Sequence, residues 1–183
     1  MKYFLSLLLL FLALPHLFAV EMAGIHIDDF FEVDGTALKL NGCGIRKKFI
    51  VKVYVGALYT ERRVATTRAV IEDVKYKAIS MYFLYKKVAT KKITNAFADG
   101  FNKNSPDFSQ SSEATAFLAL FNKDFVRGDR VDLVSAPDKG LSVYHNDRLL
   151  GTIASEKLVR AVFLVYLGDK PASKGMKQGM LGQ

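Results

Sequence analysis

The sequence predicts an α+β domain in which an antiparallel sheet is covered on one face by helices. Segments with strand periodicity and segments with helical periodicity follow each other in blocks, in the order strands, two helices, strands, two helices. The longest run of strand-forming residues spans 40–60 and carries two glycines and a basic cluster. With 183 residues, half of them hydrophobic and 24% charged, the chain is long enough to bury the core of one domain.

The first 19 residues have the pattern of a signal peptide. Lys2 supplies the positive start, an apolar run follows from Phe4 to Leu14, and Ala19 offers a small residue at the cleavage point. The apolar run is shorter than the roughly 20 residues of a membrane-spanning helix, although an uncleaved N-terminal anchor is the alternative. We therefore expect a signal peptide at 1–19, a domain at 20–183, and a mature protein that is periplasmic or secreted.

The net charge of +8 narrows the classes of partner. Basic residues occur as scattered pairs and never as a block of five, which disfavours nucleic acid. The charge suits a small acidic ligand and leaves room for transient contact with an anionic membrane surface. We expect a monomer. Cys43 is the single cysteine, so it forms no internal disulfide, and we interpret it as a small buried residue rather than a reactive thiol.

Two strands are expected in the longest run, over Thr36–Asn41 and Phe49–Tyr59, with the glycines and the basic trio in a hairpin connection between them. Strand periodicity divides the second strand into two faces. One face is fully apolar and should meet the core, and the other carries polar groups and a glycine that opens space. The first set is Phe49, Val51, Val53, Val55 and Ala57; the second is Ile50, Lys52, Tyr54, Gly56 and Leu58.

The remaining pattern predicts helices and strands in alternating blocks. The aromatic stripes of the two middle helices are more typical of a core than of a ligand cavity, and His145 is expected to be exposed beside a turn. The expected helices are 61–73 (a short helix within a loop, capped by Thr66 or Thr67), 89–102 (capped by Thr90), 109–122 (capped by Ser111 or Ser112), 156–167 (capped by Ser155) and 171–180, and the strands are 76–85, 130–135, 141–145 and 149–153.

No motif of a cofactor or metal site is found. The carboxylates of Asp28, Asp29 and Glu32 lack a third ligand at a telling spacing and fit a solvated loop and first strand better. The chain has no phosphate loop, CxxC, HExxH or GxSxG motif. We expect no cofactor and no metal.

Three segments nevertheless resemble the bacterial branch of the chalcone isomerase-like family. They read GIRKKFIVKVYVGALY, KKVATKKITNAFADGF and LVRAVFLVYLGDKP, and their order and spacing agree with the family from about residue 24 to 181. The resemblance implies an open-faced β-sandwich, in which a large antiparallel sheet lies under a layer of helices with a ligand cleft between them.

The resemblance also implies site residues. The family contains enzymes that cyclise a chalcone and fatty-acid-binding relatives that hold a carboxylate with an Arg and a Tyr, which match Arg46 and Tyr54 here. A Lys of the enzymes matches Lys92 or its neighbour Lys91. A guanidinium makes charge-assisted contacts to a carboxylate and a phenol adds a donor. We expect Arg46, Tyr54 and Lys92 to bind ligand, and no catalytic residue.

The sequence departs from the enzymes at most of their other polar positions, which argues against chalcone isomerase activity. The spacing of Arg46 and Tyr54 also imposes a condition. Eight residues of extended chain span about 26 Å, so the two side chains can share a ligand only if the chain folds back near Lys47 and Lys48. The enzyme positions fall here at Val53, at Ala89 or Thr90, near Ala96, and at Val165.

The leading hypothesis is therefore a non-catalytic, exported binder or carrier of a fatty acid or a similar apolar anion. Two alternatives remain open. One is an isomerase, an intramolecular lyase acting on an unsaturated phenolic or enone. The other is a structural or partner-binding protein of the envelope whose cleft is filled.

Overall fold

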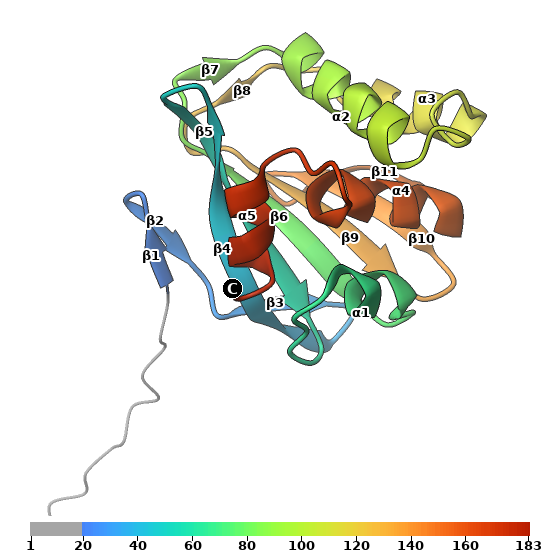
Figure 1. The fold of residues 1–183 in the computed structure, drawn as a ribbon, viewed down its shortest axis with the longest axis horizontal. Coiled ribbons are helices and arrows are strands. Elements are labelled where there is room, and N and C mark those ends of the chain that lie inside the picture. The colour runs from blue at the N-terminus through green and yellow to red at the C-terminus, as the bar shows by residue number, and fades with distance from the viewer. Residues whose placement is uncertain (1–19) are drawn as a thin grey trace, which may run out of the picture.

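The computed structural model describes residues 20–183, so the signal peptide expected at 1–19 lies outside the described residues. Sixteen elements follow one another in this part of the chain (Figure 1). The strands are β1 (Val20–Met22), β2 (Ile25–Ile27), β3 (Phe30–Val33), β4 (Thr36–Lys48), β5 (Val51–Thr60), β6 (Lys77–Phe83), β7 (Lys87–Val88), β8 (Phe125–Val126), β9 (Arg130–Ala136), β10 (Gly140–His145) and β11 (Arg148–Ile153). The helices are α1 (Thr67–Glu72), α2 (Thr90–Asn104), α3 (Ser112–Ala119), α4 (Glu156–Leu167) and α5 (Lys174–Met180).

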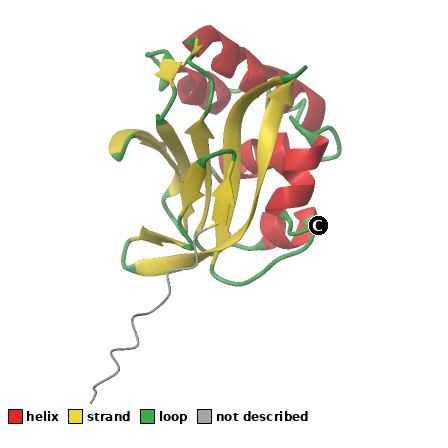
Figure 2. Ribbon diagram, turned by 90° about the vertical axis from the view of Figure 1, so that its left-hand side faces the viewer, coloured by secondary structure: helices red, strands yellow, loops and turns green. Residues whose placement is uncertain are grey.

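Seven strands form one antiparallel sheet in the order β11-β10-β9-β6-β5-β4-β3. Figure 2 shows the curled sheet with the helices gathered on one of its faces. This arrangement confirms the expected α+β class and the open-faced sandwich with a layer of helices. In the part of the chain described, no helix is long and apolar enough to cross a membrane.

The space between the sheet and helices α2 and α3 is filled by aromatic rings. Phe97 on α2 lies 4.9 Å from Phe117 and 5.6 Å from Phe121, measured between ring centroids. Phe83 of β6 stacks on Phe125 at 4.7 Å. All five rings are buried. The aromatic stripes are therefore core, as their spacing indicated, because they occupy the volume that a deep ligand cavity would need.

The hairpin of β4 and β5 differs from the sequence prediction. β4 continues through both glycines and the basic trio to Lys48, so only Phe49 and Ile50 remain as the turn. The expected apolar face also divides: Val55 and Ala57 are buried in a smaller cluster on the uncovered side of the sheet, whereas Phe49 and Val51 are exposed. The main core contacts the other face of β5, where helices cover the sheet.

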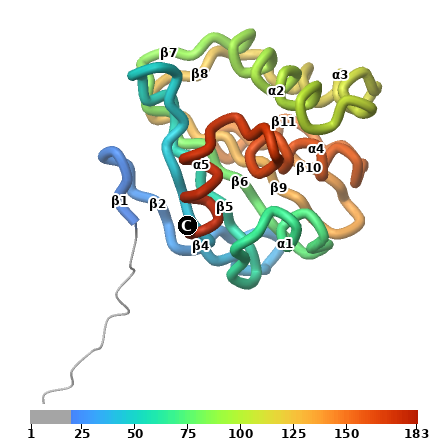
Figure 3. Tube along the Cα trace, viewed as in Figure 1, coloured from blue at the N-terminus to red at the C-terminus, as the bar shows by residue number. Residues whose placement is uncertain are grey.

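Glycines on that covered face explain how α5 packs so closely. A Cβ atom at Gly42 would lie 2.1 Å from the carbonyl oxygen of Gly179, and one at Gly44 would lie 2.6 Å from the Cα of Met176. Gly56, opposite Gly44 on β5, leaves room for the side chains of Met176 and Met180. Figure 3 shows α5 lying along this pair of strands. The glycines form the seat of a helix rather than a loop.

The helices begin close to where the capping signals place them. Thr66, Ser111 and Ser155 accept hydrogen bonds from the first turns of α1, α3 and α4, as expected. Two starts differ. The backbone N–H of Thr90 donates to Asp124 at 3.0 Å, so a carboxylate from outside α2 caps that helix. The last helix begins at Lys174 after the cap Ser173, and not at Pro171.

Candidate functional site

A cleft of about 740 Å³ opens at one end of the sandwich, between the β4–β5 hairpin, the start of β7, helix α2 and the segment that joins α4 to α5. Apolar side chains from both sides line it, and basic side chains surround them. The apolar lining residues are Phe49, Val51, Val53, Val88, Ile93, Ala96, Pro171 and Ala172, with Tyr85 beside them.

Arg46 and Tyr54 are brought together by the hairpin. They are directly opposed partners in the β4–β5 ladder, and the guanidinium carbon of Arg46 lies 6.0 Å from the centroid of the Tyr54 ring. The chain folds back at Phe49 and Ile50, which meets the condition set by their spacing. On β4, the alternating positions that seat α5 at Gly42 and Gly44 continue to Arg46, so this side chain emerges on the same face just beyond the helix.

A β-bulge adjusts the hairpin next to Arg46. The ladder shifts between Arg46 and Lys47, which leaves Val53 without an opposing residue on β4. The carbonyl of Val53 instead accepts hydrogen bonds from the backbone N–H groups of Leu84 at 2.9 Å and Tyr85 at 3.2 Å. The extra residue turns Val53 into the cleft rather than to the face expected from a regular alternation.

The guanidinium of Arg46 is held at the cleft wall by a backbone contact. Its Nη1 donates to the carbonyl oxygen of Ala172 at 2.8 Å, across the segment between α4 and α5. Within residues 20–183, no carboxylate lies within 4.0 Å of Arg46. The charge is therefore positioned in the cleft without being neutralised by the protein, and a bound anion would be a suitable partner.

Tyr54 lies behind Arg46 rather than in the cleft. Its side chain is only 5% exposed, and it does not line the cavity. Burial raises the pKa of the Tyr54 phenol, and the neighbouring Arg46 guanidinium and Tyr166 hydroxyl oppose that rise. The Tyr166 hydroxyl itself donates to the sulfur of Met81 at 3.0 Å. Tyr54 thus supports the Arg46 side of the site from within the core.

Lys92 lines the cleft from the first turn of α2, on the wall opposite the hairpin. The sequence placed Lys47 and Lys48 beside Arg46 in the hairpin but gave no sign that Lys87, Lys103 and Lys170 would join them, because these three come from segments far apart in the chain. Seven cationic side chains and a single carboxylate line the cavity. They are Arg46, Lys47, Lys48, Lys87, Lys92, Lys103 and Lys170, with Asp99 as the carboxylate.

Other candidate groups do not assemble a competing site. Cys43 is buried, and its burial raises the pKa of the thiol, as expected for a structural residue. His145 is only 16% exposed, which corrects the prediction of an exposed ring; it packs on Phe125 and lies 3.2 Å from a carboxylate oxygen of Asp129. Among the residues that the structure describes, no group of three or more metal-ligating side chains is close enough to hold an ion.

Two smaller cavities, of about 380 and 350 Å³, lie toward the uncovered face of the sheet. The larger has the opposite charge to the basic cleft, because five carboxylates and one guanidinium line it. The acidic residues are Asp28, Glu32, Asp34, Asp132 and Asp147, and the guanidinium is that of Arg130. Of these three cavities, the basic cleft has the lining that best suits an anionic ligand.

A curled antiparallel sheet with helices on one face and a basic cleft at their common end defines an open-faced β-sandwich. The chain belongs to the chalcone isomerase-like family, whose model matches residues 19–182. The fold is similar to the crystal structure of a fatty-acid binding protein from Arabidopsis thaliana, with a TM-score of 0.69 and 19% sequence identity over 89% of this chain and 95% of that one. Fatty-acid-binding protein 1 of Arabidopsis thaliana is 22% identical over an alignment of 178 positions, which covers 80% of this chain and 64% of the relative's length.

Proposed function

We propose that this protein is a non-catalytic, exported binder or carrier of a fatty acid or a similar apolar anion, and that the basic cleft is its binding site. The observation that carries the proposal is the lining of the cleft, in which cationic side chains surround apolar ones and outnumber carboxylates seven to one. Family membership and the likeness to a protein named for fatty-acid binding agree with it.

The geometry gives each part of such a ligand a place. The carboxylate would contact Arg46, whose position is fixed by the carbonyl of Ala172, while Lys92 adds positive charge from the opposite wall. The acyl chain would lie against Val53, Ile93 and their apolar neighbours. Each methylene group removed from water there contributes about 0.8 kcal/mol, and the cavity volume is in the ordinary range for small-molecule sites.

The isomerase alternative has no specific observation in its favour. The cyclising enzymes would need polar groups in the cleft to orient a phenolate, but the matching positions carry Val53 and Ala96, which present only apolar atoms there. Val165 is buried against Gly100 between α2 and α4. A binding role needs none of those groups, so it fits the cleft better.

Paired binding measurements test the proposal. We expect the protein to bind a long-chain fatty acid more tightly than the alcohol of the same length, because only the carboxylate gains charge-assisted contacts. Replacing Arg46 by alanine should weaken fatty-acid binding by about tenfold to a hundredfold and leave the alcohol nearly unaffected. Isothermal titration calorimetry, or competition with a fluorescent fatty acid, measures both.

Arg148→Ala is the matched control, since this exposed arginine lies on β11 at the opposite edge of the sheet. It should leave both affinities unchanged. Tyr54→Phe should weaken the fatty acid less than Arg46→Ala does, because Tyr54 does not line the cleft. The proposal would be contradicted by a protein that carries no fatty acid after gentle purification and also binds none when fatty acids are added.

A further inference from the structure

The tip of the β4–β5 hairpin exposes the two most solvent-accessible large apolar side chains of residues 20–183. Phe49 is 91% exposed and Ile50 is 95% exposed. Val51 follows them and is also exposed. In Figure 1 the tip extends past the body of the sheet at the end where β7 and β8 lie. Adjacent large apolar side chains projecting into solvent in this way commonly mark an interaction surface.

The turn that carries these residues has a strained backbone at an aromatic residue. Phe49 has a φ of +55°, in the left-handed region that bulky side chains avoid. The other tight turns of the sheet use the residues that such turns favour: Asp34-Gly35 joins β3 to β4, and Asn146-Asp147 joins β10 to β11. A strained aromatic residue at one turn alone indicates that its side chain is needed there.

Lysines flank the tip on both strands. Lys47 and Lys52 are directly opposed partners in the ladder, and Lys48 adjoins the turn. Like charges directly opposite each other destabilise a strand pair, and within residues 20–183 no carboxylate lies within 4.0 Å of these three lysines. An external negative charge would relieve this repulsion.

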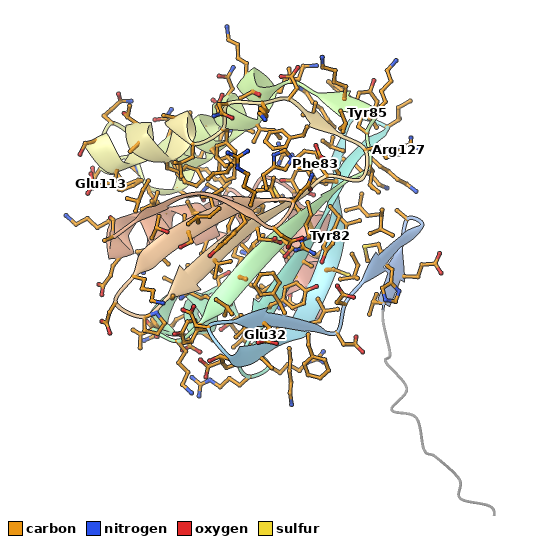
Figure 4. All side chains as sticks on the ribbon, turned by 180° about the vertical axis from the view of Figure 1, so that it is seen from behind. Glu32, Tyr82, Phe83, Tyr85, Glu113 and Arg127 are labelled. Carbon is orange, nitrogen blue, oxygen red and sulfur yellow. The ribbon has the colours of Figure 1, made fainter. Side chains whose placement is uncertain are left out.

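The neighbouring β7–β8 ribbon extends the same surface. Lys87 and Val126 are opposed there, with the Lys87 ammonium 3.1 Å from a carboxylate oxygen of Asp124, and the exposed Tyr85 shares the cleft wall with the hairpin. Figure 4 places Tyr85 and Arg127 at this end of the molecule. The surface therefore combines projecting apolar side chains with surrounding cations, and it adjoins the mouth of the basic cleft.

We propose that this hairpin tip docks the protein on an anionic phospholipid bilayer, with Phe49 and Ile50 inserted among the lipids and the flanking lysines on the headgroup phosphates. A bilayer suits the tip because it requires only apolar insertion beside negative charge. A protein partner would need a broader complementary surface than a two-residue turn supplies. Docking would place the cleft mouth at the membrane, where a fatty acid could enter or leave; that last consequence rests on the proposed function, whereas the docking itself does not.

Vesicle binding by the mature chain tests the docking. We expect co-sedimentation with vesicles of phosphatidylcholine and phosphatidylglycerol, and much weaker binding to phosphatidylcholine alone. Phe49→Gly should weaken binding to the anionic vesicles by about tenfold or more. The same change should leave the urea midpoint equal or higher, because glycine adopts the positive φ without strain. Val74→Gly is the control, since Val74 is 82% exposed in a loop away from the hairpin.

Removing the flanking charges tests the electrostatic part. Lys47→Ala combined with Lys52→Ala should lower affinity for the anionic vesicles by about thirtyfold, without loss of folding because the like-charge pair is removed. Lys157→Ala, at an exposed site on α4, should have little effect.

A tryptophan at the tip reports insertion directly, because the chain contains none. The fluorescence of Ile50→Trp should shift to the blue with anionic vesicles and be quenched by brominated lipids, whereas that of Val74→Trp should not. Equal binding by Phe49→Gly and the parent chain, or an unshifted Ile50→Trp spectrum, would overturn the docking proposal.

The two proposals fail separately. Fatty-acid binding without vesicle binding removes the docking alone and leaves a protein partner for the tip. If the parent chain and Arg46→Ala both bind vesicles but neither binds a fatty acid, the docking proposal stands and the proposed function is wrong.

Discussion

Lys77 places an ammonium group inside the core, at the first position of β6. Its side chain is 4% exposed, and its Nζ donates to the carbonyl oxygens of Val70, at 2.7 Å, and Asp73. The ring of Phe163 lies 5.3 Å from the same nitrogen. Lys77 thereby satisfies carbonyl groups at the end of α1 that would otherwise be buried without a donor. The cost is a desolvated charge, which lowers the pKa of Lys77 to about 8, although the carboxylate of Asp73 opposes the shift.

This pKa predicts how stability should depend on pH. Between about pH 8 and the ordinary lysine value of 10.5, the unfolded chain binds a proton that the folded chain has lost. The contribution of Lys77 to the free energy of unfolding should therefore rise as the pH increases across that interval. Urea titrations of the parent chain and Lys77→Met measure it, because the tyrosines that ionise in the same range are common to both.

The difference in unfolding free energy between these two proteins should grow with pH, in favour of the parent chain. Lys157→Met, at an exposed position, provides the control and should give a difference that does not change with pH. A difference between the parent chain and Lys77→Met that is flat or falls above pH 8 would contradict the lowered pKa.

The family resemblance indicated which residues could meet a carboxylate, but not how deeply each side chain would lie. Arg46 and Lys92 both reach the cleft. Tyr54 lies directly opposite Arg46 on the neighbouring strand, but Tyr166 and the core cover it. Burial of a phenol depends on helices that are distant in sequence, so no local pattern around Tyr54 could reveal it.

Among the elements, α5 and the hairpin depend on each other. The helix lies on a strip of backbone made by Gly42 and Gly44, and Gly179 of the helix faces the strand in turn, where a Cβ would lie 2.1 Å from the carbonyl oxygen of Cys43. The segment leading into α5 then fixes Arg46 through Ala172. Close packing of this helix therefore helps to position the site.

Adding one methyl group to this contact should be costly. Gly42→Ala places a Cβ against backbone that cannot move aside, and we expect a loss of about 1–3 kcal/mol in the free energy of unfolding. Gly175→Ala is the control. This glycine lies in α5, the helix that packs on Gly42, and a Cβ there meets nothing within 4 Å. It should stabilise the protein by about 0.5–1 kcal/mol.

Chemical denaturation of both variants measures these changes. A loss of stability at Gly42 together with a gain at Gly175 would not arise from a general response to alanine. A neutral Gly42→Ala would show that α5 moves away from β4 without cost, and the account of the glycines as a helix seat would then be wrong.

Element boundaries were predictable wherever a local signal set them. The range of α4 and its cap Ser155 match the prediction because capping and apolar periodicity agree there. β4 was predicted too short, because the glycines looked like a connection. The alternation of Gly42, Gly44 and Arg46 on one face was the available signal. The bulge at Val53 and the capping of α2 by Asp124 depend on pairing partners that local patterns do not include.

Across residues 20–183, the basic cleft and the larger cavity toward the uncovered face of the sheet have opposite charges. The cleft between sheet and helices gathers seven cations, and the cavity toward the uncovered face gathers five carboxylates. The net charge of +8 alone could not predict this separation, because the basic pairs are evenly spread along the chain. The fold brings seven cationic side chains from separate segments to one end, where they create a positive field that extends beyond the contacts of any single residue.

This field should accelerate the capture of anionic ligands in a manner that depends on salt. The Debye length shrinks from about 30 Å at 0.01 M salt to about 3 Å at 1 M salt. The association rate constant of a fatty acid should therefore fall by about tenfold or more over that range. The rate constant of the matching alcohol should stay nearly constant, because the field does not act on a neutral molecule. Stopped-flow fluorescence, at ligand concentrations below micelle formation, measures both rates.

Lys92→Ala combined with Lys103→Ala removes two charges from the α2 wall and should flatten the salt dependence of the fatty-acid rate. Lys157→Ala lowers the net charge from an exposed site outside the lining and should flatten it less. This comparison separates a field focused by the cleft from the effect of total charge, since each removed lysine changes the total by the same amount. The opposite outcome is that each removed lysine reduces the salt dependence of the association rate constant by the same amount, whether it lines the cleft or not. Net charge alone would then account for the capture, and the gathering of cations around the cleft would have no kinetic role.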